Sequence, residues 1–153
     1  MDIPAENYTF TNFYSLNDFQ LILNNQIALF RSTGQIFTLV SFRLDPQAEQ
    51  EGLLTINQLM NIIRLSGDKK DKICLISNSV VVMITKDNSG TINKFISRIK
   101  GNLPGSDPEY IEKVIPYISV LALKVDESIK NAEDMIQRLT LNSQKSLGQL
   151  FYY

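Results

Sequence analysis

The chain has 153 residues, of which 44% are hydrophobic, with 15 basic and 16 acidic side chains, a formal net charge of -1 and no histidine. This size and composition suit a single domain over residues 1–153 that buries a core without disulfides or metals. The balanced charge gives no electrostatic footprint for nucleic acid. The lack of histidine excludes imidazole bases, Ser-His and Cys-His nucleophiles, and zinc sites that use histidine.

The single cysteine, Cys74, lies inside an apolar pattern typical of a strand. We interpret it as a small buried hydrophobic residue rather than a reactive thiol. Residues 1–14 have no basic and apolar segment of the kind that forms a secretion signal, and no later apolar run is long enough to span a bilayer. The sequence therefore predicts a cytoplasmic protein without membrane insertion, in which residues 1–14 are a leader segment.

The first predicted helix covers Ser15 to Phe30, where apolar residues recur at helical spacing. Ser15 and Asp18 form a capping box at its start, and Gly34 closes its end. The next segment, Gln35 to Leu44, is almost continuously apolar and rich in β-formers. It predicts a central strand that is buried on both faces.

A polar and acidic loop from Gln47 to Gly52 separates this strand from the second predicted helix. That helix starts at a capping box of Thr55 and Gln58 and stops near Gly67. Two strands follow, Lys72 to Ser77 and Ser79 to Thr85, joined by a turn at Asn78. The sequence thus predicts a hairpin, and its second strand is apolar enough to lie inside the sheet.

The third predicted helix covers Asn88 to Leu103, and a Pro- and Gly-rich loop from Pro104 to Pro108 follows it. Lys113 to Val125 is predicted as a long strand whose first part is an edge or bulge because of Pro116. A fourth helix after Asp126 uses Ile129, Ala132, Ile136 and Leu139. Residues 140–153 form a tail, in which Leu150 to Tyr153 are predicted as a short closing strand.

Without the flanking helices, the predicted order is strand, helix, strand, strand, helix, strand. This order defines a ferredoxin-like βαββαβ core, in which helices cover a mostly antiparallel sheet. The predicted fold class is therefore α+β. There are no internal repeats and no low-complexity segments.

Several segments resemble, in their order and spacing, the GGDEF domain of diguanylate cyclases. Phe10 to Phe19 is similar to the family's entry motif, and Phe37 to Asp45 is similar to its first core strand, which ends in Asp-x-Asp. Asp71 is similar to the last residue of the inhibitory-site Arg-x-x-Asp. Phe95 to Ile99 resembles the helix after the signature, and Gly148 to Tyr153 resembles the closing stretch. The resemblance implies a nucleotidyl cyclase-like fold for a bacterial signalling domain.

The departures from this family concern its catalytic residues. The Gly-Gly-Asp-Glu-Phe signature falls on Ser77, Asn78, Ser79, Val80 and Val81, so both glycines and both acids are absent. Arg43 stands where the family has a metal-binding aspartate, and a fixed positive charge repels a magnesium ion. The resemblance therefore implies a protein that is not an enzyme, with no catalytic residue, no metal site and no cofactor.

Two functions remain open. The first is a regulatory module that acts through a protein partner or as a homodimer. The alternative is a receptor for cyclic di-GMP or another phosphate-bearing nucleotide, with Arg43, Arg64 and Asp71 as the candidate ligand-binding residues. Against the receptor, Asp68 replaces the arginine of Arg-x-x-Asp, and Arg43 suits an ordinary salt bridge with Asp45 equally well.

Overall fold

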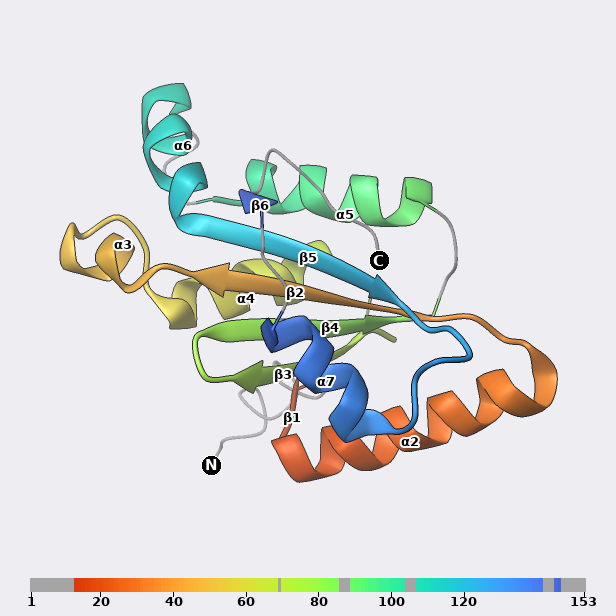
Figure 1. The fold of residues 1–153 in the computed structure, drawn as a ribbon. Helices are drawn as coiled ribbons and strands as arrows, with labels where there is room; N and C mark the ends of the chain where they lie inside the picture. Colours follow the sequence, from red (N-terminus) through yellow and green to blue (C-terminus); the bar gives the residue numbers. More distant parts are fainter. Residues whose placement is uncertain (1–12, 69, 86–88, 104–106, 142–144, 147–153) are drawn as a thin grey trace, which may run out of the picture.

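The structure, a computed structural model, describes residues 13–68, 70–85, 89–103, 107–141 and 145–146. These residues build a six-stranded sheet in the order β1-β3-β4-β2-β5-β6 (Figure 1). β1 runs parallel to β3, and the other neighbouring pairs are antiparallel. The strands are β1 (Phe13–Tyr14), β2 (Thr38–Leu44), β3 (Lys72–Ile76), β4 (Ser79–Ile84), β5 (Ile118–Lys124) and β6 (Lys145–Ser146).

Helices cover both faces of this sheet. α2 (Leu16–Thr33) and α7 (Ala132–Leu141) pack on one face, and α4 (Ile56–Ser66) and α5 (Ser89–Gly101) pack on the other (Figure 1). Three shorter helical segments lie between the main elements: α3 (Pro46–Gln50), α6 (Pro108–Val114) and the 3-10 turn η1 (Ile115–Tyr117). None of the helices in the described residues is long and apolar enough to cross a membrane.

The order β2, α4, β3, β4, α5, β5 confirms the predicted ferredoxin-like α+β core. The central strand β2 is buried on both faces, as its apolar sequence predicts, because it pairs with β4 and β5 in the middle of the sheet and helices cover the sheet on both sides. β4 is also an interior strand. The hairpin is confirmed as well, with Ser77 in the left-handed region at its turn (φ 55°).

Alternate residues of β2 enter two separate cores. Val40 and Phe42 pack with α4 and α5, whereas Leu39 packs with α2 and α7. In the first core, the rings of Phe42 and Phe95 meet edge to face, with centroids 5.6 Å apart and planes at 64°. Both rings are fully buried, so this contact fixes α5 against the centre of the sheet.

The long helix α2 begins and ends where the sequence predicts. The Ser15 hydroxyl accepts a hydrogen bond from the backbone N–H of Asp18 (3.2 Å), and Gly34 ends the helix with a φ of 77°. The outer end of α2 is tied to α7. The Asn24 amide oxygen accepts from the Ala132 N–H (2.8 Å), and Arg31 donates to the Ile129 carbonyl (2.6 Å).

The structure corrects the predicted strand from Lys113 to Val125. Residues up to Val114 belong to α6 and the next three to η1, so the strand begins only at Ile118. The cause is the start of α6: Asp107 accepts from the Glu109 N–H (3.2 Å), and a proline occupies the first helical turn. The loop predicted as far as Pro108 therefore ends in a helix.

The loop predicted from Gln47 to Gly52 is wrong for the same reason. Asp45 caps α3 by accepting from the Gln47 N–H (3.0 Å), and Pro46 begins that helix. Phe13 and Tyr14, predicted as part of a leader, form the edge strand β1. β2 starts at Thr38 rather than Gln35, and α7 starts at Ala132. The closing strand predicted from Leu150 to Tyr153 lies outside the described residues.

Candidate functional site

The turn between β3 and β4 meets the end of β2. The backbone N–H of Leu44 donates to the Asn78 carbonyl (3.1 Å), and Arg43 lies directly opposite Ser79 in the antiparallel register. Arg43 is exposed at this end of the sheet. The turn therefore presents hydroxyl and amide groups beside a guanidinium, a combination that suits an anion rather than a cation.

The acidic side chains that follow β2 hold the local structure together. Asp45 caps α3, and a Glu49 carboxylate oxygen accepts from the Ile56 N–H (2.9 Å). Glu51 accepts from Gln47 (2.8 Å) and from the Tyr117 hydroxyl (3.0 Å), and the latter bond raises the pKa of Tyr117. Across the described residues, no group of three or more Asp, Glu, Cys or His side chains could hold a metal ion.

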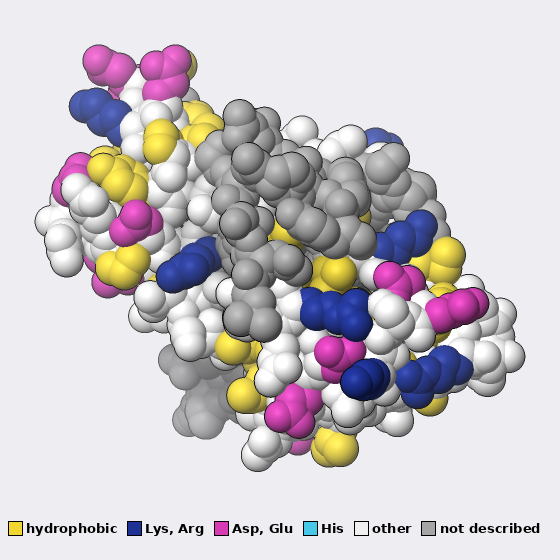
Figure 2. All heavy atoms as spheres, viewed as in Figure 1, with side chains coloured by type: hydrophobic (Ala, Val, Ile, Leu, Met, Phe, Trp, Pro, Cys, Tyr) yellow, Lys and Arg dark blue, Asp and Glu magenta, His cyan; other side chains and the backbone are white. Residues whose placement is uncertain are grey.

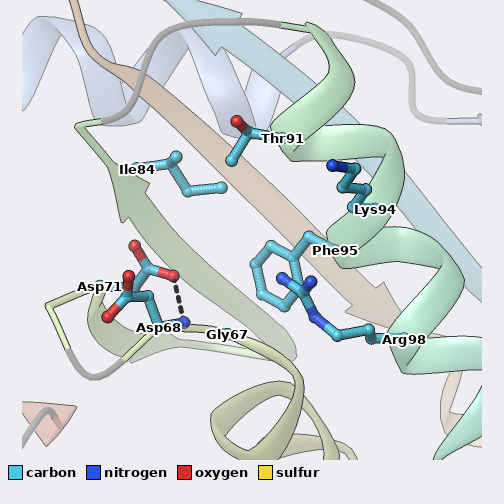
Figure 3. A pocket seen from close by; sticks show the side chains of 8 residues that line it. All are labelled: Gly67, Asp68, Asp71, Ile84, Thr91, Lys94, Phe95 and Arg98. Carbon is cyan, nitrogen blue, oxygen red and sulfur yellow. Dashed lines mark hydrogen bonds between the residues drawn. The ribbon is translucent and has the colours of Figure 1, made fainter.

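The structure also contains a cavity of about 390 Å³ between α5 and the turn that joins α4 to β3 (Figure 3). On one side lie Asp68 and Asp71 from the turn; on the other lie Lys94 and Arg98 from α5. Thr91, Lys94 and Arg98 fall on one face of α5 because they are spaced by three and four residues. The buried side chains of Ile84 and Phe95 complete the lining, together with Gly67.

The two basic side chains of the cavity differ in how firmly they are held. Arg98 donates through Nε to the Ser66 carbonyl (2.5 Å), a bond that places a cation at the C-terminal end of α4. Within the described residues, the structure gives Lys94 no hydrogen bond or ion pair. α5 thus presents an ammonium and a positioned guanidinium to the cavity.

The opposite wall depends on Asp71. Its Oδ2 accepts from the Asp68 N–H (2.8 Å), which fixes the turn before β3 (Figure 3). Gly67 leaves the room for this bond, because a Cβ at position 67 would lie 2.9 Å from the same oxygen. Asp68 in turn accepts from the Lys70 N–H (3.2 Å). Both carboxylates therefore shape the turn as well as lining the cavity.

The structure does not bring the three predicted ligand-binding residues together. Only Asp71 lines the cavity. Arg64 lies half-buried in the last turn of α4 and is not among the lining residues, although the loop that contains Asp71 follows α4 directly. Arg43 stands at the opposite end of the β3–β4 hairpin from Asp71, since it pairs with Ser79 while Lys72 pairs with Met83.

Sequence reasoning missed Lys94 and Arg98 as candidate ligand-binding residues. Their spacing on a predicted helix was the available signal, because the apolar residues Ile92, Phe95 and Ile99 already fix which face of that helix is buried. Cys74 belongs to neither candidate region. Its thiol is buried in the second core, and burial raises the pKa of the thiol to about 11. This confirms Cys74 as a buried hydrophobic residue.

Comparison with solved structures identifies the fold as that of GGDEF domains. A diguanylate cyclase protein from Thermotoga maritima is 16% identical, with a TM-score of 0.58 over 86% of this chain and 96% of that one. The active GGEEF domain of a diguanylate cyclase from Vibrio cholerae is 10% identical, with a TM-score of 0.59 over 90% and 95% of the two chains.

A microbial GGDEF domain described for a novel mode of interaction with cyclic di-GMP is 13% identical, with a TM-score of 0.57 over 91% of this chain and 93% of that one. No family model matches the sequence, and no curated protein matches it. At these identities the similarity establishes the GGDEF-like fold. What this chain does with that fold depends on its own residues.

Proposed function

We propose that this chain is a catalytically inactive GGDEF-like domain that works in the cytoplasm as a regulatory module, through contact with another protein. The observation that carries the proposal is the turn between β3 and β4. Ser77, Asn78 and Ser79 occupy the hairpin tip where the resemblance places the signature, and Arg43 lies opposite Ser79. The chain therefore offers a positive charge where a cyclase holds magnesium.

An arginine in place of an aspartate at this position is incompatible with the metal chemistry of a cyclase. Magnesium binds carboxylate oxygens and bridges them to the phosphates of a nucleotide, so a phosphoryl-transfer site needs acids close to the metal. Here the nearest carboxylate after β2 is Asp45, whose Oδ1 already caps α3. An exposed guanidinium at position 43 repels a divalent cation at the same end of the sheet.

The cavity beside α5 favours a second candidate function, a receptor for cyclic di-GMP or another phosphate-bearing nucleotide. Lys94 and Arg98 supply two positive charges on one helix face, and a guanidinium offers paired donors to a phosphate. Asp71 supplies an acceptor across the cavity. In this candidate the binding residues are Asp71, Lys94 and Arg98, while Arg43 and Arg64 stay outside the cavity.

Isothermal titration calorimetry with two ligands separates these functions. For the regulatory module we expect no saturable heat with GTP plus magnesium and none with cyclic di-GMP. Saturable binding of cyclic di-GMP that weakens by about tenfold or more in Lys94→Ala and in Arg98→Ala would contradict the regulatory module and support the receptor. Lys113→Ala is the matched control, because Lys113 is an exposed base on α6, away from the cavity.

A further inference from the structure

The cavity beside α5 carries charges of opposite sign on its two walls (Figure 3). Asp68 and Asp71 line the wall formed by the turn between α4 and β3, whereas Lys94 and Arg98 line the wall formed by α5. The phenyl ring of Phe95 stands between the two walls. The charges of these two acids and two bases sum to zero, so the cavity is neutral but has a negative side and a positive side.

We infer that this cavity binds a small zwitterion, a molecule with an ammonium at one end of an alkyl chain and a carboxylate at the other. The ammonium meets Asp68 and Asp71, and the carboxylate meets Lys94 and Arg98. The alkyl chain passes over Phe95, which closes the cavity between the walls. Such a ligand is a step beyond the proposed function, which depends on the turn between β3 and β4 and not on this cavity.

The acidic wall disfavours a ligand that is only anionic. Taken as a sphere, a cavity of about 390 Å³ is roughly 9 Å across. This width is close to the Debye length of about 8 Å at physiological ionic strength, so a bound charge feels both walls. An anion attracted by Lys94 and Arg98 is therefore repelled by Asp68 and Asp71. A ligand with one charge of each sign turns this repulsion into a second attraction.

The width of the cavity also favours a ligand whose two charges are far apart. Glycine carries its ammonium and its carboxylate on the same carbon atom, too close together to reach both walls. In 5-aminopentanoate, four methylene groups separate the two charges. These methylene groups lie over the apolar lining formed by Ile84 and Phe95, each of which is 2% exposed. The chemistry of the cavity thus fits an ω-amino acid better than glycine.

Hydrogen bonds hold both walls in place before a ligand arrives. On the acidic wall, Asp71 Oδ2 accepts from the Asp68 N–H (2.8 Å). On the basic wall, Arg98 donates through Nε to the Ser66 carbonyl, and the Asn102 side-chain amide donates to the Ser66 hydroxyl (3.0 Å). Ser66 is buried at the end of α4, directly before the turn with the acids, so these bonds connect the walls. Preorganisation of this kind lowers the cost of binding.

The exposure of the charged side chains sets the expected affinity. Asp68, Lys94 and Arg98 are all exposed to solvent, so water and salt weaken their attraction for a ligand. We therefore expect a dissociation constant in the millimolar range that rises with salt concentration.

Two-dimensional amide NMR spectra of the chain, titrated with 5-aminopentanoate, test the zwitterion site. We expect saturable shifts on both walls, at Gly67, Asp71, Thr91 and Phe95. Pentanoate and pentylamine are matched probes, because each keeps the alkyl chain and only one of the two charges. Both should bind at least about tenfold more weakly than 5-aminopentanoate, since each loses the charge-assisted bonds to one wall. Glycine should bind more weakly as well.

Two variants remove one charge from each wall. Lys94→Met keeps most of the side chain without the ammonium, and Asp68→Asn keeps an oxygen that accepts from the Lys70 N–H. Each should weaken the binding of 5-aminopentanoate by about tenfold. Lys113→Met is the matched control, because Lys113 is an exposed base on α6 outside the cavity, and it should leave the binding unchanged. Spectra that are unchanged away from the cavity show that the variants are folded.

Three results overturn the inference. The first is the lack of saturable shifts at millimolar 5-aminopentanoate. The second is equally tight binding of pentanoate, which would make the cavity a simple anion site. The third is binding that neither Lys94→Met nor Asp68→Asn weakens. None of them changes the test of the proposed function, which measures the heat of binding of GTP with magnesium and of cyclic di-GMP.

Discussion

Replacing Phe42 with alanine is expected to lower the free energy of unfolding by about 3–5 kcal/mol, the range for removing a buried phenylalanine. The Phe42 ring is fully buried in β2 and meets Phe95 of α5 edge to face. Its removal leaves a cavity under α5 and also removes the aromatic contact. Chemical denaturation in urea measures the change, and in a chain of 153 residues the melting temperature should fall by roughly 10 °C.

Phe42→Leu is the control for this prediction. It keeps most of the buried volume, so we expect a loss below about 1.5 kcal/mol. The comparison of the two variants separates the effect of the cavity on stability from the effect of replacing phenylalanine as such. Such cavities cost about 3 kcal/mol or more. A decrease in the free energy of unfolding of less than about 1 kcal/mol for Phe42→Ala would therefore contradict the packing of β2 against α5.

Leu23→Glu is expected to unfold the chain or detach α2, with a loss of more than about 3 kcal/mol. Leu23 is 0% exposed in the core between α2 and the sheet, where a carboxylate finds no water. Leu21 lies only two residues away on the opposite face of the same helix and is 65% exposed. Leu21→Glu should therefore change the stability by no more than about 0.5 kcal/mol.

Urea denaturation measures the free energy of unfolding of both glutamate variants, at a protein concentration where the chain is monomeric. Similar losses for Leu21→Glu and Leu23→Glu would mean that α2 is rotated from the described orientation. A large loss for Leu23→Glu alone supports both the core and the outward face of α2.

The main elements were predictable because local signals and burial agree. Thr55 and Gln58 form the full capping box that the sequence indicates, with bonds of 3.1 and 2.9 Å. The apolar run of β2 fits a strand paired on both sides. In these segments, capping chemistry and hydrophobic period support the same structure, so tertiary packing had nothing to override.

Two of the errors, at α3 and at α6, share one cause. An Asp-Pro pair starts both α3 and α6, and in each case the aspartate caps the helix that follows. The same pair also suits a turn, and the short helices it begins carry too few apolar residues to show a helical period. The sequence also predicts Pro116 at a strand edge or bulge, whereas it belongs to the 3-10 turn before β5. Local sequence does not separate these alternatives.

The candidate site was predictable only in part. Asp71 was identified through its place in a motif, and it does line the cavity. Lys94 and Arg98 reach the same cavity from a helix more than 20 positions away, and a single sequence does not show which helix faces which turn. Arg64 and Arg98 are equivalent as sequence signals, yet α5 directs Arg98 to the Ser66 carbonyl beside the cavity.

Charges of both signs are mixed on the face of the molecule that Figure 2 shows. Figure 2 shows basic and acidic side chains next to one another around the lower right of the molecule, without one sign dominating the described part of that face. Mixed charge of this kind gives little long-range attraction for a polyanion.

Incubation of the purified chain with GTP and magnesium, followed by chromatographic detection of cyclic di-GMP, tests the central claim most directly. Under the proposed function we expect no product above that of a protein-free control, because Arg43 lies opposite Ser79 at the hairpin tip, where the resemblance to cyclases would place acids that hold magnesium. Product that grows in proportion to the protein concentration, and that is lost in Asp45→Asn, would contradict it and make the chain an active cyclase.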